Sequence, residues 1–179
     1  IEIKGERYSE MDLQITDTGC GLERFCWAAA GTPTIYEAIY PETVSWLREL
    51  SGFDSRLDMM KGIDSNLLLS ELSMLAGILN IDVGTDVSSL YEKLVERLAS
   101  RGVDISLDDL KSITEPLSAI YAIPDHLHAL CNMLGDGLVP SNVKAGYLAR
   151  MLARRTLKMR DQIGIDVTLR ELAEHHLDV

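Results

Sequence analysis

The sequence predicts a mainly α-helical protein that begins with a short antiparallel β piece and continues as an all-helical domain. Leucine is abundant, whereas Phe, Tyr and Trp together make up only 6% of the 179 residues. Apolar residues alternate over residues 8–16, as in a half-buried strand, and recur at helical spacing afterwards. Hydrophobic residues at 46% and charged residues at 25% are ordinary values for a globular protein.

Two strands are expected at the start of the chain. Residues 1–4 form the first, Gly5–Glu6 the turn, and residues 8–16 the second. A helix follows from Leu22 and stops at Gly31, because glycine readily ends a helix in the left-handed conformation.

Further helical pieces are separated by glycine, proline and capping residues. They are expected over residues 35–38, 42–50, 66–79, 86–100, 106–121, 125–134, 141–160 and 169–177. Pro116 can kink or split its helix, and Pro124 is expected to begin a new one. The stretch from Gly52 to Gly62 is the expected boundary between two domains, residues 1–52 and residues 53–179.

The net charge of −11 argues by itself against a nucleic-acid partner. Its distribution argues otherwise, because residues 141–160 carry +6 with no acid, which leaves −17 for the rest of the chain. Such a basic island can direct a polyanion to one face of an acidic body. The alternative is a helix whose basic face pairs with that acidic body.

The chain also indicates where the protein works. Its three cysteines, Cys20, Cys26 and Cys131, lack a framework spacing, which predicts free thiols in the reducing cytoplasm. No apolar run reaches the length of a membrane helix, so no membrane partner is expected. No metal site is expected either, and zinc in particular would require paired ligands. Because the chain opens inside a strand, we expect a piece of a longer protein.

A small-molecule site is predicted where the first strand pair meets the first helix. Gly19 and Gly21 leave the backbone bare, so a ligand can approach closely. The helix start offers free N–H groups, and Arg24 offers a planar cation that can stack on a purine or bind phosphate. Asp17 could hold an ammonium group. The alternative has Asp17 as a helix cap and Arg24 paired with Glu23 or a surface acid.

The basic island forms a second candidate site. Ser141 can cap its helix and would place Asn142 at an exposed end, although Asn142 could itself be an ordinary cap. Helical spacing puts Arg150 and Arg154 opposite an apolar stripe of Leu148, Met151, Leu152 and Met159. Arg155 falls among the apolar positions, where a guanidinium needs a carboxylate or phosphate partner.

Both stretches resemble the alanyl-tRNA synthetase family. The first resembles its third class II signature region, in a form closest to the archaeal members, over residues 17–24 (DTGCGLER), Trp27 and residues 31–39 (GTPTIYEAI). The second resembles its helical tRNA-recognition region over residues 124–126 (PDH), 135–142 (GDGLVPSN) and 146–150 (GYLAR). His128 departs from the pattern, because family members commonly carry Arg or Lys there.

The resemblance implies roles for individual residues. Arg24 matches the catalytic arginine that packs on the adenine of ATP, and Asp17 matches the acid that holds the amino group of alanine. Gly19 and Gly21 match the glycines that line the small amino-acid pocket, with Gly21 also on the ATP side. Asn142 matches the residue that reads the G·U pair in the acceptor stem of tRNA(Ala), and Lys144, Arg150, Arg154 and Arg155 are its expected companions on the RNA.

The resemblance therefore implies a fragment of an alanine–tRNA ligase, a class II enzyme that uses ATP and Mg²⁺ to join alanine to tRNA(Ala). Residues 1–52 would be the end of the aminoacylation domain, and residues 53–179 would be an incomplete tRNA-recognition domain. We expect the fragment alone to be inactive. The alternatives are a non-catalytic helical RNA-binding module and a helical scaffold without an RNA partner.

Overall fold

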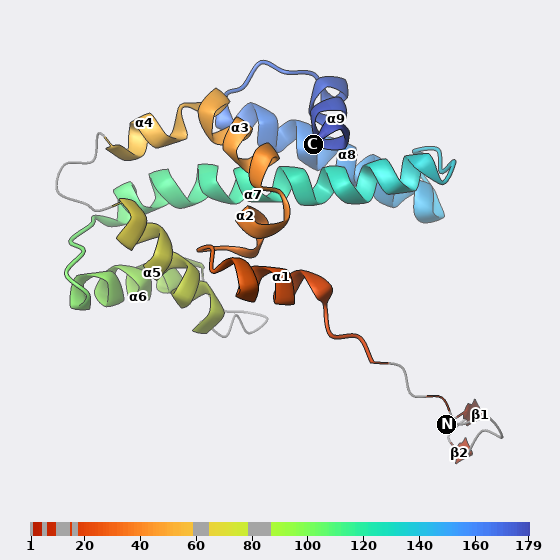
Figure 1. The fold of residues 1–179 in the computed structure, drawn as a ribbon, viewed down its shortest axis with the longest axis horizontal. Coiled ribbons are helices and arrows are strands. Elements are labelled where there is room, and N and C mark those ends of the chain that lie inside the picture. The colour runs from red at the N-terminus through yellow and green to blue at the C-terminus, as the bar shows by residue number, and fades with distance from the viewer. Residues whose placement is uncertain (1, 5–6, 10–14, 16–17, 59–64, 79–86) are drawn as a thin grey trace.

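One long helix, α7 (Leu107–Gly135), is the axis around which the other helices pack (Figure 1). The computed structural model describes residues 2–4, 7–9, 15, 18–58, 65–78 and 87–179. Most of these residues are helical, as the sequence predicts. Of the helices in this described part, none combines the length and apolarity that a bilayer crossing requires.

The chain begins with two three-residue strands. β1 (Glu2–Lys4) pairs antiparallel with β2 (Arg7–Ser9), with Ile3 opposite Tyr8. Most of the second expected strand, namely residues 10–14 and 16, lies outside the described residues. The β piece of a class II catalytic domain therefore stays a prediction.

Helices α1 (Leu22–Ala30) and α2 (Ile35–Ile39) form a short hairpin after these strands. α1 ends where expected, at Gly31, whose φ of +65° favours glycine. The Trp27 indole Nε1 donates to the Thr32 carbonyl at 2.7 Å and closes the turn between the two helices. α2 then starts with a capping box between Thr34 and Glu37.

Helix α3 (Pro41–Ser51) ends at Gly52 as expected, but the chain then enters a helix that the sequence did not predict, α4 (Phe53–Asp58). Phe53 and Leu57 of α4 are buried. The first half of the expected interdomain boundary is thus packed helix, while residues 59–64 are not described. The division into two domains stays a prediction.

Helices α5 (Ser65–Ile78) and α6 (Val87–Ser100) follow close to the predicted bounds. The prediction of two helices over residues 106–121 and 125–134 is wrong, because α7 runs unbroken through Pro116 and Pro124. α7 packs against α3, α4, α6, α8 and α9. These contacts stabilise the helix despite the backbone hydrogen bonds that the prolines remove.

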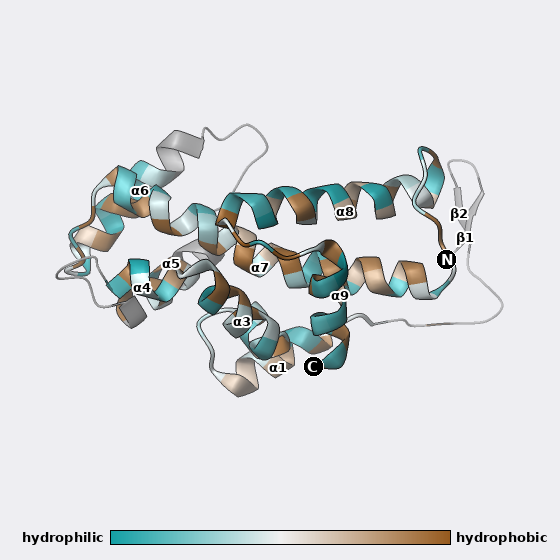
Figure 2. Ribbon diagram, turned by 90° about the horizontal axis from the view of Figure 1, so that it is seen from above, coloured by the Kyte–Doolittle hydropathy of each residue, from teal (hydrophilic) through white to brown (hydrophobic). Residues whose placement is uncertain are grey.

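Helices α8 (Lys144–Ile163) and α9 (Leu169–Asp178) complete the fold, and α8 lies along α7 (Figure 2). The predicted apolar stripe of α8 is partly wrong, because Leu148 is 44% exposed. The buried stripe instead comprises Gly146, Ala149, Leu152, Thr156 and Ile163. α9 begins with a capping box between Thr168 and Glu171, and Thr168 is the cap that the sequence predicts.

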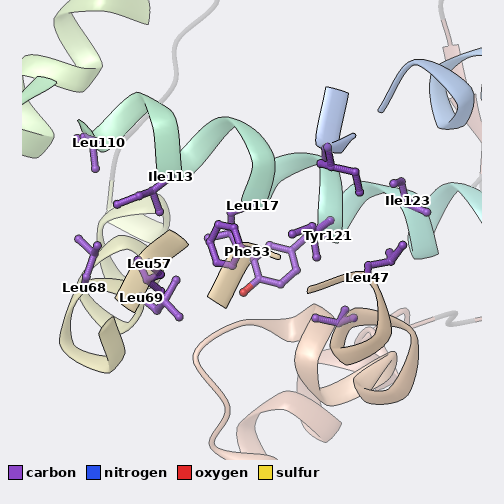
Figure 3. Packing of buried hydrophobic residues seen from close by; sticks show 14 of the residues in the cluster. Leu47, Phe53, Leu57, Leu68, Leu69, Leu110, Ile113, Leu117, Tyr121 and Ile123 are labelled. Carbon is purple, nitrogen blue, oxygen red and sulfur yellow. The ribbon is translucent and has the colours of Figure 1, made fainter. Parts of the chain in front are cut away.

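A continuous apolar core fills the space between α7 and its neighbours (Figure 3). Its α7 side includes Leu110, Ile113, Leu117, Ile120, Ile123 and Leu127. Leu47 of α3 and Phe53 of α4 face this side, and both are almost fully buried. Burial of this apolar surface is the main term that stabilises the helices against unfolding.

Candidate functional site

The predicted small-molecule site is only partly described. Gly21 is the N-cap of α1 with a φ of +67°, a backbone conformation that favours glycine. The Arg24 backbone N–H donates to the Gly21 carbonyl at 3.1 Å. The aliphatic stem of Arg24 lies over Gly21, since a Cβ added to Gly21 would be 3.5 Å from Arg24 Cδ. The structure therefore brings these two predicted residues into contact.

Gly19 lies beside this contact in open surroundings. It is exposed, and an added Cβ would meet no atom within 4 Å. Asp17 lies outside the described residues. Arg24 is exposed and has no ion-pair partner in the part of the chain that the structure describes, so the alternative of an Arg24–Glu23 pair is not observed there.

The basic island forms a groove of about 400 Å³ along α8. Its lining residues are Tyr147, Arg150, Met151, Arg154, Arg155 and Lys158. Among the described residues, none of its four cations has an ion-pair partner. The alternative in which the basic face pairs with the acidic body is therefore not observed for these four side chains. Uncompensated cations in a groove attract anions such as phosphate.

The predicted position of Arg155 is wrong. Its side chain is exposed and lines the groove, whereas the sequence placed it among the apolar positions. α8 is rotated so that Ala149, Leu152 and Thr156 face α7, and this rotation turns residue 155 outward. The Thr156 hydroxyl, which is buried, donates to the Leu152 carbonyl at 2.9 Å, so its burial costs little.

Asn142 lies in the loop that leads into α8, and its side chain is exposed. Neither Asn142 nor Ser141 caps the helix, because the N-cap is Val143 and no side chain accepts from the first turn. The Ser141 hydroxyl instead donates to the Val143 carbonyl at 3.1 Å. The prediction of a Ser141 cap is thus wrong, and Asn142 is available to a ligand. Lys144 is exposed at the first position of α8 but does not line the groove.

The charge of the groove also acts on His126, a half-buried residue of α7. His126 Nδ1 is shielded from solvent and has no hydrogen-bond partner among the residues that the structure describes. Burial lowers the pKa of His126 from its ordinary 6.5; Asp125 opposes this change, and the Arg155 charge adds to it. The charge of Arg155 thus acts on α7 as well as on the groove, and it disfavours a second positive charge on His126.

Sequence reasoning did not select Tyr147, Met151 or Lys158 as site residues. They share the groove with Arg150 and Arg154 because both 147, 150, 154, 158 and 147, 151, 154, 158 are series with steps of three or four residues, which lie on one helix face. This spacing is the sequence signal from which the three additional groove residues could have been predicted. An exposed tyrosine among arginines offers a flat ring next to cations, a combination that suits bases and phosphates.

The two candidate sites do not meet. Figure 2 shows α1 and α8 on opposite sides of α7. Within the described residues, no group of three His, Cys, Asp or Glu side chains could hold a metal ion.

Comparison with known proteins identifies relatives along almost the whole chain. The family described as tRNA synthetases class II (A) matches residues 2–179. The alanine–tRNA ligase of Methanosarcina barkeri is 43% identical over 177 residues, which are 99% of this chain and 18% of that protein. The alanine–tRNA ligase of Natronomonas pharaonis is 45% identical over 170 residues, or 95% of this chain and 17% of that protein. The chain thus spans less than one fifth of these relatives.

Proposed function

Because the chain belongs to the class II tRNA synthetase family, we propose that it is part of an archaeal-type alanine–tRNA ligase. The complete enzyme activates alanine with ATP and Mg²⁺ and transfers it to tRNA(Ala). One observation carries this proposal: proteins named alanine–tRNA ligase match 95% to 99% of the chain at 43% to 45% identity.

In this proposal the α1 side contributes to alanine activation. Arg24 packs on the adenine of ATP, where its charge also stabilises the negative charge of the phosphates. Its position over Gly21 and its lack of an ion pair within the described residues support this role. Gly19 and Gly21 leave room for a substrate with a methyl side chain, and Asp17 binds the alanine ammonium group.

The α8 side contributes to tRNA recognition. Arg150, Arg154 and Arg155 bind phosphates of the acceptor stem, and Lys144 adds a charge beside Asn142. A-form RNA presents a wide, shallow minor groove to proteins, and a G·U pair leaves the guanine 2-amino group there without a partner. The Asn142 carbonyl accepts a hydrogen bond from that amino group. The exposure of Asn142 and the unpaired cations of the groove support this role.

Alanine-dependent ATP–pyrophosphate exchange tests the proposed reaction. We expect the full-length protein that contains this chain to catalyse exchange with alanine, and we expect residues 1–179 alone to be inactive. Arg24→Ala in the full-length protein should abolish exchange. The matched control Arg170→Ala should not, because Arg170 is an exposed residue of α9. Full-length protein without alanine-dependent exchange would overturn the proposed reaction, and exchange by the chain alone would overturn its status as a fragment.

A second candidate function is a non-catalytic RNA-binding module. The observation in its favour is that α8 supplies the entire lining of the basic groove without help from α1. This function predicts salt-dependent tRNA binding that Arg24→Ala does not change, together with no exchange activity in the full-length protein. A helical scaffold, in contrast, predicts no salt-dependent binding of tRNA.

A further inference from the structure

Gly146 is buried in the third position of α8, and its backbone does not adopt the left-handed conformation that favours glycine. A glycine inside a helix lowers helix stability relative to alanine. Its presence therefore requires another reason, which is the close approach of a neighbouring segment. A Cβ at position 146 would collide with Ser141 Oγ and would stand 2.6 Å from the Val139 carbonyl oxygen.

The neighbouring segment is the loop that carries Asn142. The Ser141 backbone N–H donates to the Gly146 carbonyl at 2.9 Å, so the loop is bonded to the helix at the place where the Cβ is missing. The Ser141 hydroxyl then bonds the Val143 backbone, donating to its carbonyl at 3.1 Å and accepting from its N–H at 3.4 Å. Both residues that flank Asn142 are thereby held.

The junction between this loop and α8 is also conformationally demanding. Lys144, the first residue of α8, has a φ of +50°, which residues with a side chain rarely adopt. Such a conformation persists only where the surrounding contacts impose it. The contact of the loop with Gly146 helps to fix the residues before Lys144, together with the Ser141–Val143 hydrogen bonds.

We propose that Gly146 is a positioning residue for RNA specificity: it lets the loop close against α8 and so fixes Asn142 relative to the basic groove. This inference rests on the proposed reading of the G·U pair by Asn142. Gly146 itself does not contact the RNA. A displaced loop would leave phosphate binding by the groove intact but would misplace the Asn142 amide, because hydrogen bonds weaken steeply with distance and angle.

The test uses the full-length protein that contains this chain and two acceptor-stem duplexes that differ only in a G·U or a G·C pair. Dissociation constants are measured at several salt concentrations. We expect Gly146→Ala to reduce the preference for G·U by about 3- to 10-fold, the equivalent of one lost hydrogen bond. The salt dependence should stay as in the unchanged protein, because the phosphate contacts are retained.

Two further variants make the test specific. Gly135→Ala is the matched control, since Gly135 is also helical but an added Cβ there meets no atom within 4 Å. It should retain the G·U preference. Ser141→Ala removes the hydroxyl contacts without adding volume and should reduce the preference less than Gly146→Ala does. Circular dichroism measures whether each variant keeps its helices.

The outcomes separate the two proposals. Loss of preference in Gly146→Ala with unchanged salt dependence supports the positioning role. A retained preference in both Gly146→Ala and Ser141→Ala overturns that role and leaves base reading by Asn142 intact. Equal weakening for both duplexes, or a loss of helix in Gly146→Ala with an unaffected Ser141→Ala, also overturns it. An unchanged protein without G·U preference overturns base reading and the positioning role together.

Discussion

Helices α1 and α8 both carry arginines of the candidate sites, but they differ in how they bury their apolar residues. α8 packs a complete stripe against α7, and Ala149 and Leu152 are 0% and 8% exposed. α1 has no buried residue, and its Leu22 and Phe25 are 74% and 61% exposed. The charged face of α8 therefore stands on a packed core, whereas α1 is joined to α2 at its end.

This difference implies that the chain forms the basic groove of α8 by itself, whereas it supplies only part of the site around Arg24. The backbone that carries the basic groove is preorganised, because burial fixes α8 against α7. Arg24 and its glycines occupy an exposed edge, and no described residue encloses them. We therefore expect RNA binding to be measurable with this chain alone and alanine activation to require the longer protein.

The largest expected effect breaks the packed side of the comparison. Leu152 of α8 is 8% exposed, so Leu152→Ala should lower the free energy of unfolding by about 2–5 kcal/mol. The matched change Leu22→Ala, at 74% exposure, should alter it by less than about 0.5 kcal/mol. Urea unfolding of the chain followed by circular dichroism measures both. Similar values for the two variants would remove the distinction between α1 and α8.

A smaller effect concerns the charges on the packed side. Replacing Arg150, Arg154 and Arg155 together by Gln should weaken the binding of an acceptor-stem RNA. The slope of log affinity against log salt concentration should become shallower by about 0.7–0.9 for each lost phosphate contact. Arg170→Gln on α9 is the control, since that exposed residue lies outside the groove. An unchanged salt slope in the triple variant would show that the groove does not bind phosphate.

The smallest expected effect is a pH dependence at the junction of α9 with the rest of the fold. Burial, assisted by the neighbouring His128 and His175, lowers the pKa of His176 below its ordinary 6.5. The unfolded chain then binds a proton more readily than the folded chain, so the free energy of unfolding should decrease as the pH falls below 6.5.

His176→Gln removes this titration and should flatten the dependence. Part of it should remain, because burial also lowers the pKa of His126. Urea unfolding above and below pH 6.5 gives the comparison. A variant with the full pH dependence of the unchanged chain would contradict this role of His176. The centroid of the His176 ring lies 5.4 Å from that of Tyr40 and 5.9 Å from that of His128.

Local signals predicted the helix ends well and the long-range packing poorly. Gly31, Gly52 and Thr168 act locally, so the structure confirms the ends and the cap that they predict. Pro116 and Pro124 also act locally, but packing on five neighbouring helices overrides them and keeps α7 continuous. Propensity alone cannot anticipate such tertiary contacts.

For the candidate sites, too, the sequence predicted the local features and missed those that depend on packing between segments. The sequence identified the cations of α8 and the exposure of Asn142, both of which depend on composition and on position at a helix end. It misplaced Arg155, because a rotation of α8 by about one residue moves a side chain from the core to the surface. The sequence also predicted Ser141 as a helix cap. It could not show that the loop packs against Gly146 and that Ser141 is bonded there instead.

We propose that this chain carries the acceptor-stem reader of an alanine–tRNA ligase, and alanylation kinetics of the full-length protein are the decisive test of this role. We predict a higher kcat/KM for a tRNA(Ala) acceptor stem with a G·U pair than for the same stem with G·C, and loss of this difference in Asn142→Ala. Equal kcat/KM for the two stems in the unchanged protein, or a preference that survives Asn142→Ala, would show that Asn142 does not read the G·U pair.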